Sequence, residues 1–293
     1  MSTVRTETGD LNVCDGSIYL DDGSLLVTEI SGTVGRLDTD GVLSRIGCGG
    51  GLNGGAVGPD GAVYLSNNGG VLLGTGEDGL TMITGGAPGN ELGDKGSLQR
   101  LDLKTGEVQS LYTHVDGIHI GWMNDIVFDI SGNFYAVDTI ARQGLLRRPA
   151  RGVHSGRGDR PRYAERRRTL ARRCQPLRER DPRRRSGMER GRSRHSYGPA
   201  GLLPWPEQHG WDGLAVDGAG NVCVSNLVGS GISVLSPDGR QLDRFVTPEY
   251  DRWVTNISFG GPDLDTAYVC LAGRGILYSV QWPWGGLQLN FAA

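Results

Sequence analysis

WDGLAVDGAGNVCVSNL (residues 211–227) joins two short apolar stretches through a polar turn, and this arrangement decides the fold. Gly, Asp and Asn favour tight turns, whereas short alternating runs of Val, Ile, Leu and Tyr favour strands. The turn followed by a short apolar strand recurs along the chain as DDGSLLVTEI (21–30), PDGAVYLSNN (59–68), ISGNFYAVDT (130–139) and GPDLDTAYVCLA (261–272). Hardly any helical periodicity interrupts these phrases, so the sequence predicts an all-β protein.

The spacing of the phrases predicts a propeller. One hairpin cannot bury both faces of its sheet, and repeats about 40 to 50 residues apart are typical of propeller blades with four strands. The interval from Gly61 to Gly132 is longer, which predicts an extra loop in TGGAPGNELGDKG (84–96). The segment GILYSVQWPWGGLQLNF (275–291) is expected to pair with an N-terminal strand, which would remove an exposed sheet edge.

A short polar residue stands seven positions before a fixed point of each turn. These residues are Asp15, Asn53, Asn124, Asp212 and Asn256. Asn and Asp are common at strand starts because they bond local backbone, which explains one such residue better than five in register. Equivalent positions of successive blades surround the propeller axis, so we expect a ring of oxygen donors without His or Cys. Such a set suits calcium or magnesium.

The net charge of −3 hides two different compositions. Residues 142–194 hold 20 of the 30 basic side chains and 5 of the 33 acidic ones. Clustered Arg can neutralise phosphates, so one interpretation is a nucleic-acid-binding arm. That interpretation predicts strongly salt-dependent binding of DNA or RNA that is lost when residues 145–200 are deleted.

A second interpretation of the Arg-rich stretch is a segment translated in the wrong frame. When the codons permitted by Tyr163–Asp181 are read one base later, they accommodate TPNGVGLSPDGASLYVSET without a violation. This is a further copy of the repeat, with an Asn that overlaps Glu165 and a turn Asp that overlaps Arg172. We therefore expect six blades, with the blade at about 145–200 disrupted by a frameshift that begins near Gly144 and ends between His195 and Gly210. The whole of 1–293 would then be one propeller domain.

The remaining composition favours a soluble, cytoplasmic protein. The N-terminus MSTVRTETGD has no basic and apolar leader pattern, and no run of apolar residues is long enough to span a membrane. The cysteines are five in number and widely scattered, which indicates buried or free thiols and neither disulfides nor a zinc site. The sequence does not define an oligomeric state.

The chain resembles the regucalcin/gluconolactonase (SGL) family in several phrases. They are GLNGGAVGPDGAVYLSNNGG (51–70), MNDIVFDISGNFYAVD (123–138), WDGLAVDGAGNVCVSNLVGSGISVLSPDGR (211–240) and VTNISFGGPDLDTAYVCLAGRGILYSV (254–280). Proteins of that family are six-bladed propellers that hydrolyse sugar lactones with a divalent metal. The resemblance therefore implies a metal-dependent lactonase acting on a small lactone, without nucleic acid or membrane, with calcium as the first choice of cation and magnesium, zinc or manganese as alternatives.

The resemblance also implies roles for individual residues. Asp15 stands where the family usually has a metal-binding Glu, Asp212 matches a metal-binding Asp, and Asn124 matches an additional Asn of the site. Asp212 and Asn124 would also act in catalysis, as proton acceptor and as stabiliser of the oxyanion. Two departures follow: the Asn of the family's PNG phrase exists only in the shifted frame, and Trp122 replaces an Arg two residues before Asn124.

Four residues are expected to contact the substrate: Asn53, Asn256, Trp122 and His119. For Trp122 the alternative is packing between blades, and for His119 it is a solvated or structural loop residue. Because the chain lacks the PNG Asn, a non-catalytic propeller that binds a cation or ligand is the alternative function. Metal-stimulated turnover of a lactone separates the two.

Overall fold

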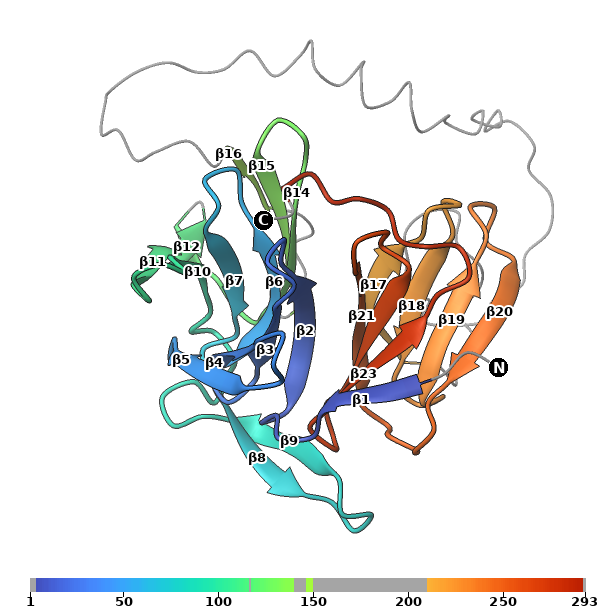
Figure 1. Cartoon of the computed structure of the whole chain (residues 1–293). Helices are drawn as coiled ribbons and strands as arrows, with labels where there is room; N and C mark the ends of the chain where they lie inside the picture. The colour runs from blue at the N-terminus through green and yellow to red at the C-terminus, as the bar shows by residue number, and fades with distance from the viewer. Residues whose placement is uncertain (1–3, 116, 140–145, 150–209, 292–293) are drawn as a thin grey trace, which may run out of the picture. The chain divides into compact units, whose positions relative to one another are not determined.

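The computed structural model describes residues 4–115, 117–139, 146–149 (backbone only) and 210–291, and these residues form strands and no helix (Figure 1). The predicted all-β class and the propeller-like arrangement of small antiparallel sheets are confirmed. The expected blade at about 145–200 lies almost wholly outside the described residues. Among the described residues, no helix is long and apolar enough to cross a membrane.

The first four sheets are antiparallel meanders, in which each strand pairs with the next strand of the same sheet along the chain. The first sheet contains β2 (Cys14–Tyr19), β3 (Leu25–Glu29), β4 (Thr33–Leu37) and β5 (Leu43–Gly47). The second contains β6 (Leu52–Val57), β7 (Val63–Asn67), β10 (Ser97–Leu101) and β11 (Val108–Tyr112). The third contains β14 (Met123–Phe128), β15 (Asn133–Asp138) and β16 (Leu146–Pro149). The fourth contains β17 (Trp211–Val216), β18 (Val222–Asn226), β19 (Gly231–Leu235) and β20 (Gln241–Val246).

The fifth sheet joins the two ends of the chain. It consists of β21 (Val254–Gly260), β22 (Thr266–Leu271), β23 (Ile276–Gln281) and the N-terminal β1 (Val4–Thr8). β1 pairs antiparallel with β23, with Val4 opposite Val280 and Thr6 opposite Tyr278. The expected pairing of the C-terminal segment with an N-terminal strand is confirmed. It covers the edge of β23 that would otherwise present unpaired N–H and C=O groups.

Two hairpins interrupt the repeat between Gly61 and Gly132. The hairpin of β8 (Val71–Thr75) and β9 (Thr81–Gly86) leaves the second sheet after β7, and β12 (His114–Val115) pairs with β13 (Ile118–His119) after β11. The extra chain predicted at 84–96 therefore begins earlier, at Val71. The apolar run Val71–Leu73, its pairing with Ile83–Gly86 and the tight turn at Gly79 make this stretch a hairpin instead of a loop.

We call the first strand of each meander its leading strand, which in the fifth sheet is β21 because β1 joins that sheet at its other edge; each leading strand packs against the leading strand of a neighbouring sheet. The series runs β14, β6, β2, β21 and β17, so β14 and β17 are its two ends in the described part of the chain. Apolar side chains of neighbouring sheets fill the space between them. Val27 and Cys14 of the first sheet pack with Cys270 and Leu277 of the fifth, for example. This order brings the starts of the leading strands together.

Candidate functional site

Every leading strand carries a bulge near its start. In β2, Cys14 pairs with Glu29 and Gly16 with Thr28, which leaves Asp15 as the extra residue. The same shift falls at Asn53 and Gly54 of β6, at Asn124 and Asp125 of β14, and at Asp212 and Gly213 of β17. Bulges re-aim side chains near functional sites. These four polar residues of the predicted ring therefore lie where the regular pairing of the β-ladder is interrupted.

The last leading strand differs by one residue. In β21 the extra residue is Thr255, because Val254 pairs with Leu271 and Asn256 with Cys270. Asn256 accordingly lies level with Gly213 of the neighbouring strand, where an added Cβ would come 2.5 Å from Asn256 Cγ. The count of seven residues before the turn placed Asn256 beside Asp15 and Asp212. In the β-ladder, however, Thr255 and not Asn256 occupies the bulge position that corresponds to Asp15. The hydroxyl of Thr255 donates to Cys14 O at 3.1 Å.

Asp15, Asp125 and Asp212 form a cluster of three carboxylates. Burial and the charges of Asp212 and Asp125 raise the pKa of Asp15 well above its ordinary value. Burial raises the pKa of Asp125 to about 6. Burial and the charge of Asp125 also raise the pKa of Asp212 to about 6. No Lys, Arg or His of the described residues is among the main influences on these three groups, so the cluster concentrates negative charge without a cationic side chain.

Asparagines partly offset this repulsion. A side-chain hydrogen bond from Asn53 lowers the pKa of Asp15, and one from Asn124 lowers that of Asp212. The predicted ring residues Asp15, Asn53, Asn124 and Asp212 are thus brought together. Asn256 joins them through the close approach of its amide to Gly213 and Gly16.

Asp125 is the functional residue that sequence reasoning missed. It follows Asn124 directly, and its carboxylate accepts the N–H of Ile126 at 2.8 Å. A Cβ on Gly54 of the neighbouring strand would lie 2.0 Å from Asp125 Oδ1, so the Gly at this position lets the carboxylate lean over β6. The signal was present in the sequence: Gly16, Gly54 and Gly213 follow the other ring residues, and Asp125 alone puts a charge in that place.

His119 and Trp122 are placed differently from the ring. The His119 ring lies 4.4 Å from that of His114, centroid to centroid, and its Nδ1 bonds Ile120 O at 2.8 Å. Trp122 is partly buried, and its carbonyl accepts the N–H of Thr139 at 3.0 Å. The contacts found for these two residues do not connect them with the carboxylates.

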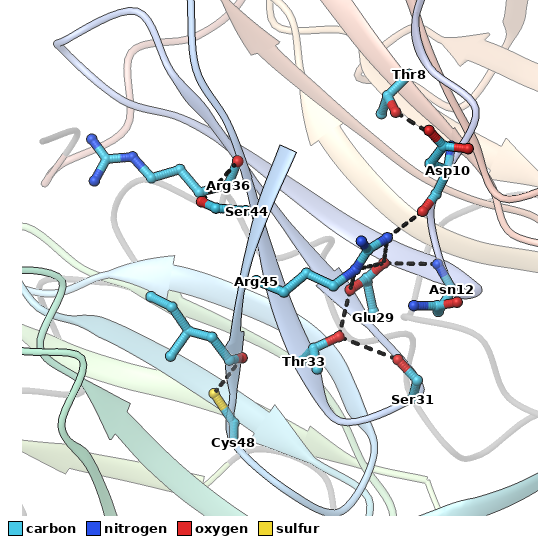
Figure 2. A network of polar contacts seen from close by, with 11 residues as sticks. Thr8, Asp10, Asn12, Glu29, Ser31, Thr33, Arg36, Ser44, Arg45 and Cys48 are labelled. Carbon is cyan, nitrogen blue, oxygen red and sulfur yellow. Dashed lines mark hydrogen bonds and ion pairs between the residues drawn. The ribbon is translucent and has the colours of Figure 1, made fainter. Parts of the chain in front are cut away.

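Polar residues at the ends of second strands fix the chain that leads into the site. Glu29 is fully buried, accepts the N–H of Asn12 at 2.7 Å, and forms an ion pair with Arg45 at 3.0 Å (Figure 2). Thr33 donates to the same carboxylate, and Arg45 also bonds Asp10 O. Asp138 likewise accepts the N–H of Gly121 at 2.6 Å, two residues before β14. These bonds fix the direction in which β2 and β14 enter.

The donor set fits a hard divalent cation. It consists of carboxylate and amide oxygens, and no cationic side chain of the described residues compensates the negative charge concentrated there, which is the environment such cations prefer. In the described parts of the chain, no three His, Cys, Asp or Glu side chains stand close enough together to hold a metal ion by themselves. A cation at the cluster would therefore need amide oxygen as well.

Comparisons with known proteins agree with the resemblance seen in the sequence. Residues 193–273 match the family described as the SMP-30/Gluconolactonase/LRE-like region. Pentonolactonase XacC of Haloferax volcanii is 42% identical over 62 residues, which are 21% of each chain. The 6-deoxy-6-sulfogluconolactonase of Pseudomonas putida is 38% identical over 77 residues, 26% of each chain. The matches thus span about a fifth to a quarter of these curated relatives.

A solved structure extends the likeness of fold over nearly the whole chain. A gluconolactonase of Xanthomonas campestris superposes with a TM-score of 0.59 and 16% identity, covering 96% of this chain and 90% of that one. Identity at this level shows the shared fold alone. Residues 193–273 are therefore similar to the SMP-30/Gluconolactonase/LRE-like region, the resemblance that the repeated phrases predicted, and the described chain has a propeller-like all-β fold.

Proposed function

We propose that the protein is a lactonase of the gluconolactonase type that hydrolyses a small sugar lactone with the help of a divalent cation. The observation that carries this proposal is the cluster of Asp15, Asp125 and Asp212, a concentration of negative charge that no cationic side chain of the described residues compensates. Burying charge without compensation is costly, and such sites persist where function requires them. The family match over residues 193–273 includes Asp212, and parts of the chain match two named lactonases, which supports this reaction class.

Asp15, Asn124 and Asp212 would hold the cation, calcium in first place, with magnesium, zinc or manganese as alternatives. When bound, a divalent cation polarises the lactone carbonyl and lowers the pKa of a water molecule. Asn53, Asn256, Trp122 and His119 remain the proposed contacts of the substrate. Of these, Asn53 and Asn256 lie with the cluster, which makes them the stronger candidates.

The chain's own residues then account for the proton transfers. Asp212 is partly exposed, and a carboxylate whose pKa is about 6 accepts a proton readily near neutral pH. It would take the proton from the water molecule as the water oxygen attacks the carbonyl carbon. The ring C–O bond then breaks, and the released ring oxygen takes the proton from Asp212, which returns to its ionised form. Asn124, which donates to Asp212, would hold this carboxylate in place and stabilise the oxyanion.

We also propose that the segment at about 145–200 is a sixth blade of this single domain, translated out of frame. Three observations support the proposal. The family match begins at residue 193, and β14 and β17 are the two ends of the packed series in the described part of the chain. Val127 and Val137 of the third sheet and Leu214 of β17 are 51%, 42% and 54% exposed, as expected of faces that lack a neighbouring sheet.

A turnover assay tests the function. Sugar lactones are offered to the chain with added calcium, magnesium, zinc or manganese, beside a frame-restored chain whose codons between Gly144 and Gly210 are shifted by one base. We expect metal-stimulated hydrolysis by the restored chain, and weaker hydrolysis by the chain as written because it lacks the PNG Asn. If the frame-restored chain folds but shows no metal-stimulated turnover, the lactonase proposal is wrong. That result would favour the alternative, a propeller that binds a cation or ligand without catalysis.

A further inference from the structure

Three buried asparagines connect the base of the β8–β9 hairpin with the carboxylate cluster. Asn90, Asn68 and Asn53 are 3%, 0% and 5% exposed, and we call them the asparagine relay. Asn90 lies after β9, Asn68 follows β7, and Asn53 lies in the bulge of β6 beside Asp15. Asn68 and Asn90 belong neither to the ring predicted from the sequence nor to the ligand positions implied by the family.

Backbone groups fix which way each amide points. The N–H of Gly70, which can only donate, bonds Asn68 Oδ1 at 2.8 Å. Asn68 must therefore turn its NH₂ group the other way, where it donates to Asn53 Oδ1 at 2.7 Å. Because this bond occupies the oxygen of Asn53, the NH₂ group of Asn53 is left to face Asp15. The orientation of Asn53 thus follows from a peptide N–H two steps away.

Asn90 anchors the start of the relay. Its NH₂ group donates to the carbonyls of Asn68 and Gly70, both at 3.0 Å, and its oxygen accepts the N–H of Lys95 at 2.9 Å. All three partners are backbone groups with one possible role each. The turn that carries the Gly70 N–H is held in place by these bonds, so no rotation of a single amide can reverse the relay without leaving buried groups unpaired, which is costly.

We propose that Asn68 is a positioning residue for the site: it holds the Asn53 amide so that its NH₂ group donates to Asp15. The importance for a cation rests on the proposed function, whereas the coupling between Asn68 and Asp15 does not. On this view Asn53 supplies no oxygen to a cation, and its proposed contact with the substrate is made through its NH₂ group. It leaves Asp15 as a pure acceptor whose remaining lone pairs are directed to the site, the role of groups behind a metal ligand.

A double-mutant cycle on the cation-free protein tests the coupling. Asn68→Asp keeps an oxygen for the Gly70 N–H but presents a second oxygen to Asn53, which must reverse its amide and turn its oxygen toward Asp15. Asp15→Asn supplies an NH₂ group to that reversed amide. We expect Asn68→Asp to be far less harmful in the Asp15→Asn background, with a coupling of at least tenfold in the unfolding equilibrium constant at pH 8.

Asn67→Asp is the matched control, because it places the same charge one residue earlier. Asn67 is 3% exposed, but its amide donates to Gly49 O and Gln99 and takes no part in the relay. Charge repulsion alone would couple both aspartates to Asp15 alike, and equal coupling, or none, would overturn the proposal. Should Asn68→Asp fail to fold, folding of the Asn68→Asp/Asp15→Asn double variant supports it and failure of both contradicts it.

Calcium titration of the folded Asn68→Asp variant gives a second measurement. Substitutions behind a metal ligand typically weaken binding about 10- to 100-fold, and we expect a loss in this range with Asn67→Asp unchanged. If the wild-type chain binds no calcium, the proposed function fails while the cycle still decides the relay. The two failures are therefore distinguishable.

Discussion

Glu29 and Asp15 are both buried acids at the entry to the first sheet, and they differ in what surrounds them. Glu29, which pairs with Cys14 in the β2–β3 ladder, has Arg45, the Asn12 N–H and Thr33 as partners. Asp15, the next residue after Cys14, faces two further carboxylates and receives one bond from Asn53. Burial alone therefore does not mark a functional acid. Asp15, which has no cationic side chain among its described partners, is the carboxylate suited to bind a metal cation.

The largest expected effect comes from removing a carboxylate of the Asp15, Asp125 and Asp212 cluster. We expect Asp212→Asn to lower kcat by about 10²- to 10⁴-fold, because the amide cannot accept the proton from water. Steady-state lactone hydrolysis measures it, best in the frame-restored chain. Asp243→Asn, an exposed acid on β20 of the same sheet, should keep full turnover, and equal losses in the two variants would contradict the role of Asp212.

Removing the compensated acid should affect stability instead of chemistry. Glu29→Ala leaves Arg45 and the Asn12 N–H without their carboxylate, and we expect a loss of about 3 kcal/mol in the free energy of unfolding. Urea denaturation measures it. Arg240→Ala, which removes an exposed pair with Asp238, should cost less than about 1 kcal/mol. If Glu29→Ala has normal stability, water replaces the bonds of Glu29 to Arg45, Asn12 and Thr33. The proposed difference between Glu29 and Asp15 would then be wrong.

A cation should stabilise the folded protein through the cluster alone. At a calcium concentration about 100 times the Kd, linkage predicts a gain of about 2.7 kcal/mol in the free energy of unfolding, reversed by a chelator. Asp15→Asn should abolish the gain, whereas Glu29→Ala should retain it. Thermal unfolding with and without calcium measures both, and a gain that survives in Asp15→Asn places the cation elsewhere.

The smallest predicted effect concerns pH and Asp125. Because the pKa of Asp125 is raised to about 6, the folded state holds its proton more tightly than the unfolded chain does. Its contribution to stability is greatest below about pH 4 and is lost as the pH rises to about 6. Without a cation, Asp125→Asn should therefore stabilise the protein by about 1 to 3 kcal/mol at pH 7 and have little effect at pH 4. Urea denaturation at pH 4 and pH 7 measures the change in the free energy of unfolding. A variant that is destabilised at pH 7 would show that the Asp125 carboxylate has a stabilising partner and would contradict the prediction.

Repetition made most of the fold predictable. Five copies of one phrase predicted the strands and the turns. They also predicted that Asp15, Asn53, Asn124 and Asp212 lie together, because residues at the same position of each copy lie at the same position of each sheet. What broke the repeat was harder to predict. The bulge that moves Asn256 by one residue depends on ladder pairing, and the hairpin at Val71 depends on a short apolar run and a local turn that the count of repeats ignores.

The relay and Asp125 lay outside prediction for a different reason. Asn68 and Asn90 are 22 residues apart and meet only because the hairpin folds back on its base. Their amides are defined by backbone partners that no composition or motif reveals. Asp125 could have been found by comparing the residue that follows each ring position, since Gly stands there in three of the other four copies.

The pairing of β1 with β23 has a consequence for biosynthesis. Val4–Thr8 is synthesised before every other described strand, and its partner Ile276–Gln281 is synthesised after them, so the fifth sheet stays incomplete until Ile276–Gln281 has been made. Until then β1 and the edge of β22 remain open to pairing with other chains. A product truncated before Ile276, or an N-terminal fusion that restrains Val4–Thr8, should aggregate even though every residue of the carboxylate cluster is present.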